Sequence, residues 1–153
     1  MRYWLFKSEP HAYSFEQLRE DRTTPWSGVR NFQARNNMDE MRVGDLGLFY
    51  HSSIPEPCAV GICRVAKQAY ADATAFDRES EYYDGRSRPD KPLWRLVDVE
   101  YVREFPRPVT LAQMRAEPRL VGMSLLKRGS RLSVQPVMPA EWEVILELAG
   151  DKR

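Results

Sequence analysis

The side chains with the greatest capacity for chemistry lie in one short stretch, WSGVRNFQARNNM at residues 26–38. One large aromatic, Trp26, precedes several side chains that can each form more than one hydrogen bond. The pattern is typical of two structures: a solvated helix with a buried Trp at its root, or a recognition site for a flat polar ligand such as a nucleobase. The stretch alone favours the solvated helix. Other parts of the chain are needed to distinguish it from a recognition site. The polar members are Arg30, Asn31, Gln33, Arg35, Asn36 and Asn37.

A second stretch, His51-Ser52-Ser53, could indicate a hydrolase with Glu9 or Asp45 as the orienting acid. Adjacent residues of a strand point to opposite faces, so His51 is poorly placed to activate Ser52. The alternative is that these side chains satisfy backbone groups at the end of a strand. We therefore expect no catalytic residue in this stretch.

The sequence contains few residues or motifs that could form a metal or cofactor site. Cys58 and Cys63 are separated by an odd offset within one expected strand, so their side chains should point to opposite faces. Neither His11 nor His51 stands at metal-ligand spacing from a Cys or another His. The sequence contains no G-x-G-x-x-G and no G-x-x-x-x-G-K motif, so it does not indicate a dinucleotide-binding fold or a phosphate-binding loop. We expect neither a metal ion nor a cofactor.

Length and charge narrow the class of protein. The 153 residues predict one domain over positions 1–153, and no apolar run approaches the about 20 residues of a membrane span. The N-terminal segment lacks the features of a signal peptide, so we expect a cytoplasmic protein. A net charge of +1 argues against affinity gained by neutralising many phosphates. Any binding of nucleic acid should therefore depend on a pocket and be modest.

The elements that must position these residues do not follow the regular βαβα order of a parallel sheet. Capping boxes at Ser14 and Thr110 predict two short helices, and Ala34, Met38 and Met41 share one face of another. The order predicts an α+β protein around a small, mostly antiparallel β-barrel with short helices at its rim. Strands are expected at residues 3–7, 46–51, 59–66, 93–105 and 131–137, and helices after Ser14, from Gly28 to about Val43, after Thr110 and from Pro139.

Aromatic residues near polar side chains form the remaining candidate site. Residues 72–92 are polar yet contain Phe76, Tyr82 and Tyr83, and long loops of this kind are often functional. A base held between aromatics gains about 1–3 kcal/mol, while its extrusion from a duplex costs a few kcal/mol. Such a pocket would therefore favour single strands or weakened base pairs. We assign Trp4 and Trp142 to the core.

Six separated motifs extend over nearly the whole chain: YWLFKSEP at 3–10, WSGVRNFQARN at 26–36, GDLGLFYHS at 44–52, VGI at 60–62, YYD at 82–84 and RLSVQPV at 131–137. In this order they resemble the motifs of the EVE domain family. The resemblance implies a PUA-like fold, related to the YTH and ASCH domains, and a pocket for chemically modified bases with no family-wide catalytic activity.

Carried over motif by motif, the resemblance implies a set of ligand-binding residues. Three positions depart from the family pattern: Ser27 stands where an acidic residue is common, Phe32 where Tyr is frequent, and Arg95 where a second Trp often follows Trp94. These departures could change which base edge is accepted. The implied ligand-binding residues are Lys7, Ser8, Glu9, Trp26, Arg30, Asn31, Tyr50, His51, Ser52, Arg131 and Ser133.

The first hypothesis is a protein that reads a modified base in single-stranded or base-flipped nucleic acid. Trp26 would stack on the base, Asn31 and Ser8 would bind its edge, and Arg30, Arg131 or Lys7 would hold a phosphate. One alternative is a small hydrolase of modified nucleosides that uses Lys7, Glu9 and His51, and another is a protein-interaction module with an exposed apolar patch. The sequence leaves open DNA or RNA, the modification, and the oligomeric state.

Overall fold

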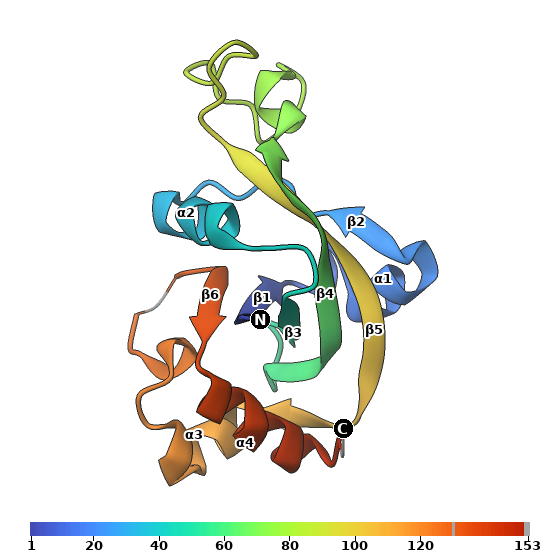
Figure 1. Ribbon diagram of the computed structural model, residues 1–153, viewed down its shortest axis with the longest axis vertical. Helices are drawn as coiled ribbons and strands as arrows, with labels where there is room; N and C mark the ends of the chain where they lie inside the picture. The colour runs from blue at the N-terminus through green and yellow to red at the C-terminus, as the bar shows by residue number, and fades with distance from the viewer. Residues whose placement is uncertain (130, 152–153) are drawn as a thin grey trace.

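The computed structural model of the protein describes residues 1–129 and 131–151. One six-stranded sheet is surrounded by short helices, with a long ribbon of two strands extending to one end (Figure 1). The strands are β1 (Tyr3–Ser8), β2 (Thr23–Pro25), β3 (Leu46–His51), β4 (Cys58–Ala71), β5 (Arg95–Thr110) and β6 (Val134–Val137). The α-helices are α1 (Phe15–Asp21), α2 (Phe32–Glu40), α3 (Leu111–Ala116) and α4 (Pro139–Ala149), and three 3-10 helices are η1 (Ala73–Phe76), η2 (Pro118–Leu120) and η3 (Ser124–Leu126).

The strands lie in the order β2-β5-β4-β3-β1-β6. Strands β1 and β3 run parallel, and every other pair in this order is antiparallel. Because β1 is apolar on both faces, it lies inside the sheet between β3 and β6. Strands β4 and β5 extend beyond the sheet and are joined by residues 72–94, called here the 72–94 loop, which forms the upper end of the molecule in Figure 1.

The α+β class is confirmed, but the expectation of a closed barrel is wrong. The edge strands β2 and β6 are short, contain Pro25 and Pro136 respectively, and are not paired with each other. Proline cannot donate a ladder hydrogen bond, which limits how far either edge can extend. Helix α2 packs against both β5 and β6. The sheet therefore remains open between β2 and β6.

Two separate groups of buried side chains lie on the two faces of the sheet. Alternation along β1 sends Leu5 to one face and Trp4 and Phe6 to the other, as the two-residue period of a strand requires. The first group, called here the aliphatic core, includes side chains of α3 and α4, among them Met114, Trp142 and Ile145. The second group, called here the aromatic core, includes side chains of α1 and α2. Its aromatic members are Trp4, Phe6, Phe15, Trp26 and Phe49. Trp4 and Trp142 are buried, as predicted.

Strand β2 was not among the expected strands. The other strands and the α-helices agree in type with the sequence-based predictions, whereas several of their boundaries differ. Helix α2 begins at Phe32, because Gly28 has a left-handed φ of +82° and Asn31 is an extended N-cap whose side chain accepts from the N–H of Ala34. The side chain of Ser14 accepts from the N–H of Gln17, which is half of the expected capping box. The side chain of Gln17 donates to Asp21 instead of returning to Ser14. Strands β4 and β5 run several residues further than predicted, and β6 is shorter.

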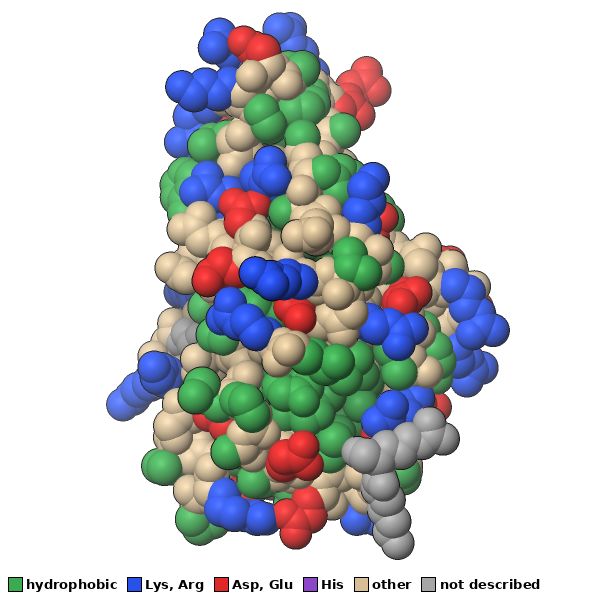
Figure 2. All heavy atoms as spheres, in the orientation of Figure 1, with side chains coloured by type: hydrophobic (Ala, Val, Ile, Leu, Met, Phe, Trp, Pro, Cys, Tyr) green, Lys and Arg blue, Asp and Glu red, His purple; other side chains and the backbone are tan. Residues whose placement is uncertain are grey.

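Within residues 1–129 and 131–151, no helix has the length and apolar character needed to cross a membrane. The same residues contain no group of three or more His, Cys, Asp or Glu side chains that could hold a metal ion. On the face shown in Figure 2, Lys and Arg side chains are interspersed with Asp and Glu rather than forming one continuous basic stripe.

Candidate functional site

A pocket of about 670 Å³ lies where the sheet is open, between the end of β1, strand β2 and the residues that precede β6. Its volume falls within the range of small-ligand sites. Eight of the predicted ligand-binding residues line it, although they come from three separate parts of the sequence. These are Lys7, Ser8, Glu9, Trp26, Arg30, Asn31, Arg131 and Ser133.

Trp26 lines the pocket and is mostly part of the aromatic core. Only 8% of its surface is exposed, and its ring makes edge contacts with Phe6 and Phe49 at centroid distances of 5.3 and 5.6 Å. Its backbone N–H donates to Val97 at 2.8 Å, which fixes the start of the 26–31 segment to β5. Trp26 therefore offers a small part of its ring to the pocket.

Tyr82, from the 72–94 loop, supplies a more accessible aromatic ring. It lines the pocket with 37% of its surface exposed. A Cβ built at Gly28 would lie 2.7 Å from the Tyr82 ring, so the ring packs directly on the glycine backbone. Glycine is required here for two reasons, the left-handed φ and the close approach of this ring. Sequence reasoning placed Tyr82 among the aromatic candidates but did not include it in the site.

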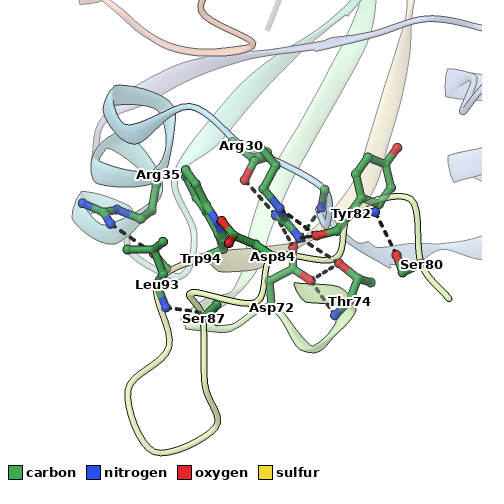
Figure 3. Close-up of polar contacts among 12 residues, drawn as sticks. Arg30, Arg35, Asp72, Thr74, Ser80, Tyr82, Asp84, Ser87, Leu93 and Trp94 are labelled. Carbon is green, nitrogen blue, oxygen red and sulfur yellow. Dashed lines mark hydrogen bonds and ion pairs between the residues drawn. The ribbon is translucent and has the colours of Figure 1, made fainter. Parts of the chain in front are cut away.

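Arg30 holds the 72–94 loop against residues 26–31 of the pocket (Figure 3). Its Nη1 donates to Asp72 at 3.1 Å and to the carbonyl of Val29 at 2.9 Å. Its Nη2 donates to Thr74 at 3.1 Å, and Nη2 and Nε donate to the carbonyl of Tyr82 at 2.7 and 3.1 Å. A guanidinium has five N–H donors, and these five bonds use all of them. No donor of Arg30 is left for the phosphate we expected it to hold.

Asp72 is fully buried and accepts from four donors. Its carboxylate receives the N–H of Gly28 at 2.8 Å, the N–H and hydroxyl of Thr74 at 3.0 and 2.6 Å, and the guanidinium of Arg30. Burial by itself would raise the pKa of Asp72, but these hydrogen bonds outweigh it and the pKa lies below its ordinary value. No sequence signal points to this carboxylate, because its partner Arg30 lies 42 residues away.

Asn31 presents an unused donor beside this network. Its side-chain oxygen caps α2 by accepting from the N–H of Ala34 at 2.9 Å. Among the residues that the structure describes, its amide nitrogen has no hydrogen-bond partner, and the residue is exposed at the pocket. The cap fixes the direction of the amide, so the donor is oriented before any ligand arrives.

The end of β1 contributes side chains of opposite charge. Lys7 is half-buried, burial lowers the pKa of its ammonium group, and no carboxylate pairs with it among the described residues. Glu9 accepts from Ser53 at 3.3 Å and lies 3.1 Å from His11. The hydroxyl of Ser8 donates to the carbonyl of Tyr13, which leaves its lone pairs free to accept.

Arg131 and Ser133 close the pocket from the segment before β6. The carbonyl of Ser133 accepts the N–H of Lys7 at 2.8 Å and so ties this segment to β1. Arg131 is exposed and forms no ion pair within the described part of the chain. Its guanidinium is therefore available to an anion at the pocket mouth, unlike that of Arg30.

Three predicted site residues lie outside the pocket. Tyr50 is buried in the aliphatic core, and burial raises its pKa to about 12. His51 lines a different hollow, where its Nε2 accepts the N–H of Phe15 at 3.1 Å and burial lowers its pKa. Ser52 contributes through its backbone, donating to the carbonyl of Ser8 at 3.0 Å. His51 therefore lines a different hollow from Lys7 and Glu9, the other residues of the hydrolase alternative, and its Nε2 is already bonded.

The fold and the pocket agree with one family of proteins. The EVE domain profile matches residues 2–148, and the chain belongs to the EVE domain family. The resemblance seen in the sequence motifs is thereby confirmed.

Among full-length relatives, thymocyte nuclear protein 1 of Danio rerio is 40% identical over 97% of this chain and 72% of its own length. Thymocyte nuclear protein 1 of Homo sapiens is 37% identical over 95% of this chain and 73% of its own.

Solved structures show the same fold. A crystal structure of human THYN1 protein in complex with DNA containing 5-methylcytosine is 35% identical, with a TM-score of 0.93 and coverage of 100% of both chains. A crystal structure of a Pseudomonas putida protein is 48% identical, with a TM-score of 0.93 over 96% of this chain and 99% of that one. An ASCH protein from Zymomonas mobilis, 9% identical with a TM-score of 0.54 over 97% of this chain and 99% of that one, shares the fold alone.

Proposed function

We propose that this protein binds nucleic acid and reads one base, with 5-methylcytosine as the first candidate, in the pocket between β1, β2 and the 72–94 loop. The observation that carries the proposal is a polar pocket that combines an exposed aromatic ring, Tyr82, with an oriented unused donor, the amide of Asn31. The complex of human THYN1 protein with DNA containing 5-methylcytosine supports the choice of base.

The pocket residues suit the edge of a cytosine. Its O2 and N3 are acceptors and its N4 is a donor, so the Asn31 amide would donate to the ring edge and the Glu9 carboxylate would accept from N4. Tyr82 would stack on the base, with part of Trp26 beneath it. Arg131 and Lys7, which lack carboxylate partners in the described part of the chain, would hold the adjoining phosphates.

Selectivity for the methyl group should be modest. One buried methyl contributes about 0.8 kcal/mol, roughly fourfold in affinity. A net charge of +1 adds little general attraction to the phosphate backbone. A single strand, which avoids the cost of base extrusion, should therefore bind better than a duplex.

Titration calorimetry with single strands that carry one 5-methylcytosine or one cytosine, as DNA and as RNA, tests the proposal. Tyr82→Ala should weaken binding by about 1–3 kcal/mol. Tyr83→Ala is the matched control, since this neighbouring tyrosine is similarly exposed but does not line the pocket.

Asn31→Ser isolates the donor, because serine keeps an N-cap oxygen for α2 while it removes the amide. We expect weaker binding with the stability of the protein nearly unchanged. Equal affinity of wild type, Tyr82→Ala and Asn31→Ser for every strand would overturn the proposed function.

A further inference from the structure

Phe32, next to the pocket residue Asn31, is an exposed aromatic ring on a rigid support. It is the first residue of α2, and 48% of its surface is exposed. Its ring stacks on Trp94 with a centroid distance of 4.8 Å and an interplanar angle of 22°. Trp94 is only 2% exposed, and its Nε1 donates to Asp84 at 2.8 Å. The inner face of Phe32 is thus held in place while the ring remains accessible.

Arg35 lies one turn further along α2 and keeps a positive charge beside this ring. Its guanidinium carbon is 4.9 Å from the Phe32 ring and 6.0 Å from the Trp94 ring. Since Phe32 and Trp94 are 4.8 Å apart, these distances place the guanidinium beside the two rings rather than across Phe32 from Trp94. The outer face of Phe32 is therefore not covered by Arg35.

The hydrogen bonds of Arg35 are made to neutral groups. Its Nη1 donates to the carbonyl of Leu93 at 3.0 Å, and its Nε and Nη2 donate to the side chain of Asn36 at 3.2 and 2.9 Å. No carboxylate lies within ion-pair distance among the described residues, and three bonds leave two of five N–H donors unused. Arg30 is the opposite case, because Asp72 neutralises it and all its donors are occupied.

We infer that Phe32 and Arg35 form a second subsite, which binds the nucleotide next to the base held in the pocket. The flanking base stacks on the outer face of Phe32, and Arg35 contacts the phosphate that joins the two nucleotides. This inference rests on the proposed function of the pocket. Two observations select a nucleotide as the occupant: the uncompensated guanidinium matches a phosphate, and the subsite adjoins the pocket through consecutive residues, Asn31 and Phe32.

Phe32→Leu tests the stacking, because leucine keeps an apolar cover over Trp94 but lacks a flat ring. NMR titration would compare four ligands. They are 5-methyldeoxycytidine monophosphate, a trinucleotide with 5-methylcytosine at its centre, and two versions of that trinucleotide, one abasic on the 5′ side and one abasic on the 3′ side. We expect Phe32→Leu to weaken the full trinucleotide about tenfold. The monophosphate, and the trinucleotide that is abasic on the stacking side, should bind wild type and variant equally.

Tyr83→Leu is the control for loss of an exposed aromatic ring away from the pocket. Arg35→Gln tests the phosphate contact and should reduce the slope of log affinity against log salt by about 0.7 for the trinucleotide, while Arg35→Lys should restore it. A slope unchanged by Arg35→Gln would overturn the phosphate contact.

The outcomes separate the subsite from the pocket. If Phe32→Leu weakens the monophosphate as much as the trinucleotide, Phe32 acts by shaping the pocket and the subsite is wrong. If Phe32→Leu changes no affinity, the subsite is wrong while the proposed function stands. If wild-type protein binds neither the monophosphate nor the trinucleotide, the proposed function fails and the subsite fails with it.

Discussion

The two faces of the sheet are held together by different physical means. On one face, the aliphatic core packs α3 and α4 through side chains such as Leu5, Leu48 and Ile145, all fully buried. On the other, the aromatic core adjoins two buried carboxylates, Asp45 and Asp72, each of which accepts several hydrogen bonds. The pocket lies on the second face.

This difference explains how the pocket can stay open in a small protein. Apolar packing depends on filled volume and tolerates no cavity, since each void removes contact energy. Hydrogen bonds to a buried carboxylate instead fix directions, so they can hold a loop at a set distance. The hydrogen bonds of Arg30 to Asp72 and to the carbonyl of Tyr82 keep the 72–94 loop at the pocket.

The largest expected effect on stability comes from breaking the pair between Arg30 and Asp72. Asp72→Ala leaves the guanidinium of Arg30 without its partner and the N–H of Gly28 without an acceptor. Loss of one partner of a buried pair costs about 3–5 kcal/mol, which urea unfolding can measure. Asp90→Ala in the same loop is the control, because its pair with Arg88 is exposed and should contribute nothing measurable. Equal stability of the two variants would contradict the role of Asp72.

A volume deletion in the aliphatic core should separate stability from binding. Ile145→Ala removes a fully buried side chain of α4 and should lower the free energy of unfolding by about 2–5 kcal/mol. Affinity of the folded protein for an oligonucleotide with 5-methylcytosine, measured well below the unfolding temperature, should not change. Val121→Ala, at an exposed position, should alter neither quantity. A weaker affinity in Ile145→Ala would show that the two faces are coupled.

A single methyl group should probe the distance at which the loop is held. In Gly28→Ala the new Cβ would meet the Tyr82 ring at 2.7 Å and would also occupy a left-handed φ. We expect a loss of about 1–3 kcal/mol and weaker base binding, because the ring must move. Gly44→Ala has a φ of +97° but no atom within 4 Å, so it isolates the backbone penalty. Identical behaviour of the two variants would exclude a role for the ring contact.

The pH dependence of stability should give the smallest effect. The folded-state pKa of Asp72 lies below its ordinary value of 3.8, so its contribution is fully present above that value and is lost as pH falls through the folded pKa. One such group contributes at most about 1.4 kcal/mol per pH unit. The stability difference between wild type and Asp72→Asn should therefore shrink below about pH 4. A difference that stays constant from pH 7 to pH 2.5 would mean that the charge of Asp72 contributes nothing.

Local patterns made the elements predictable. An N-cap at Ser14 and a capping box at Thr110 begin helices, and Ala34, Met38 and Met41 form one buried face. Strand ends were less predictable, because β4 and β5 stabilise each other beyond the point where their sequences become polar. Closure of the sheet could not be predicted either, since it depends on whether two distant edge strands meet.

The candidate site was predictable as a set of motifs but not as a network. Lys7, Asn31 and Ser133 meet in one pocket, as their motifs suggested. The partnership of Arg30 with Asp72 has no local signal, so nothing in the sequence distinguishes an arginine that links two segments from a phosphate ligand. Only the folded structure shows that every N–H donor of Arg30 is already bonded.

The prolines at both free edges of the sheet bear on how copies of this protein meet one another. An exposed strand edge is a template for pairing with another chain, and such pairing leads to aggregation. Pro25 in β2 and Pro136 in β6 each remove one N–H that a foreign strand would need, and both strands are short. The open sheet can therefore present a ligand pocket between its edges without inviting a second molecule to complete it.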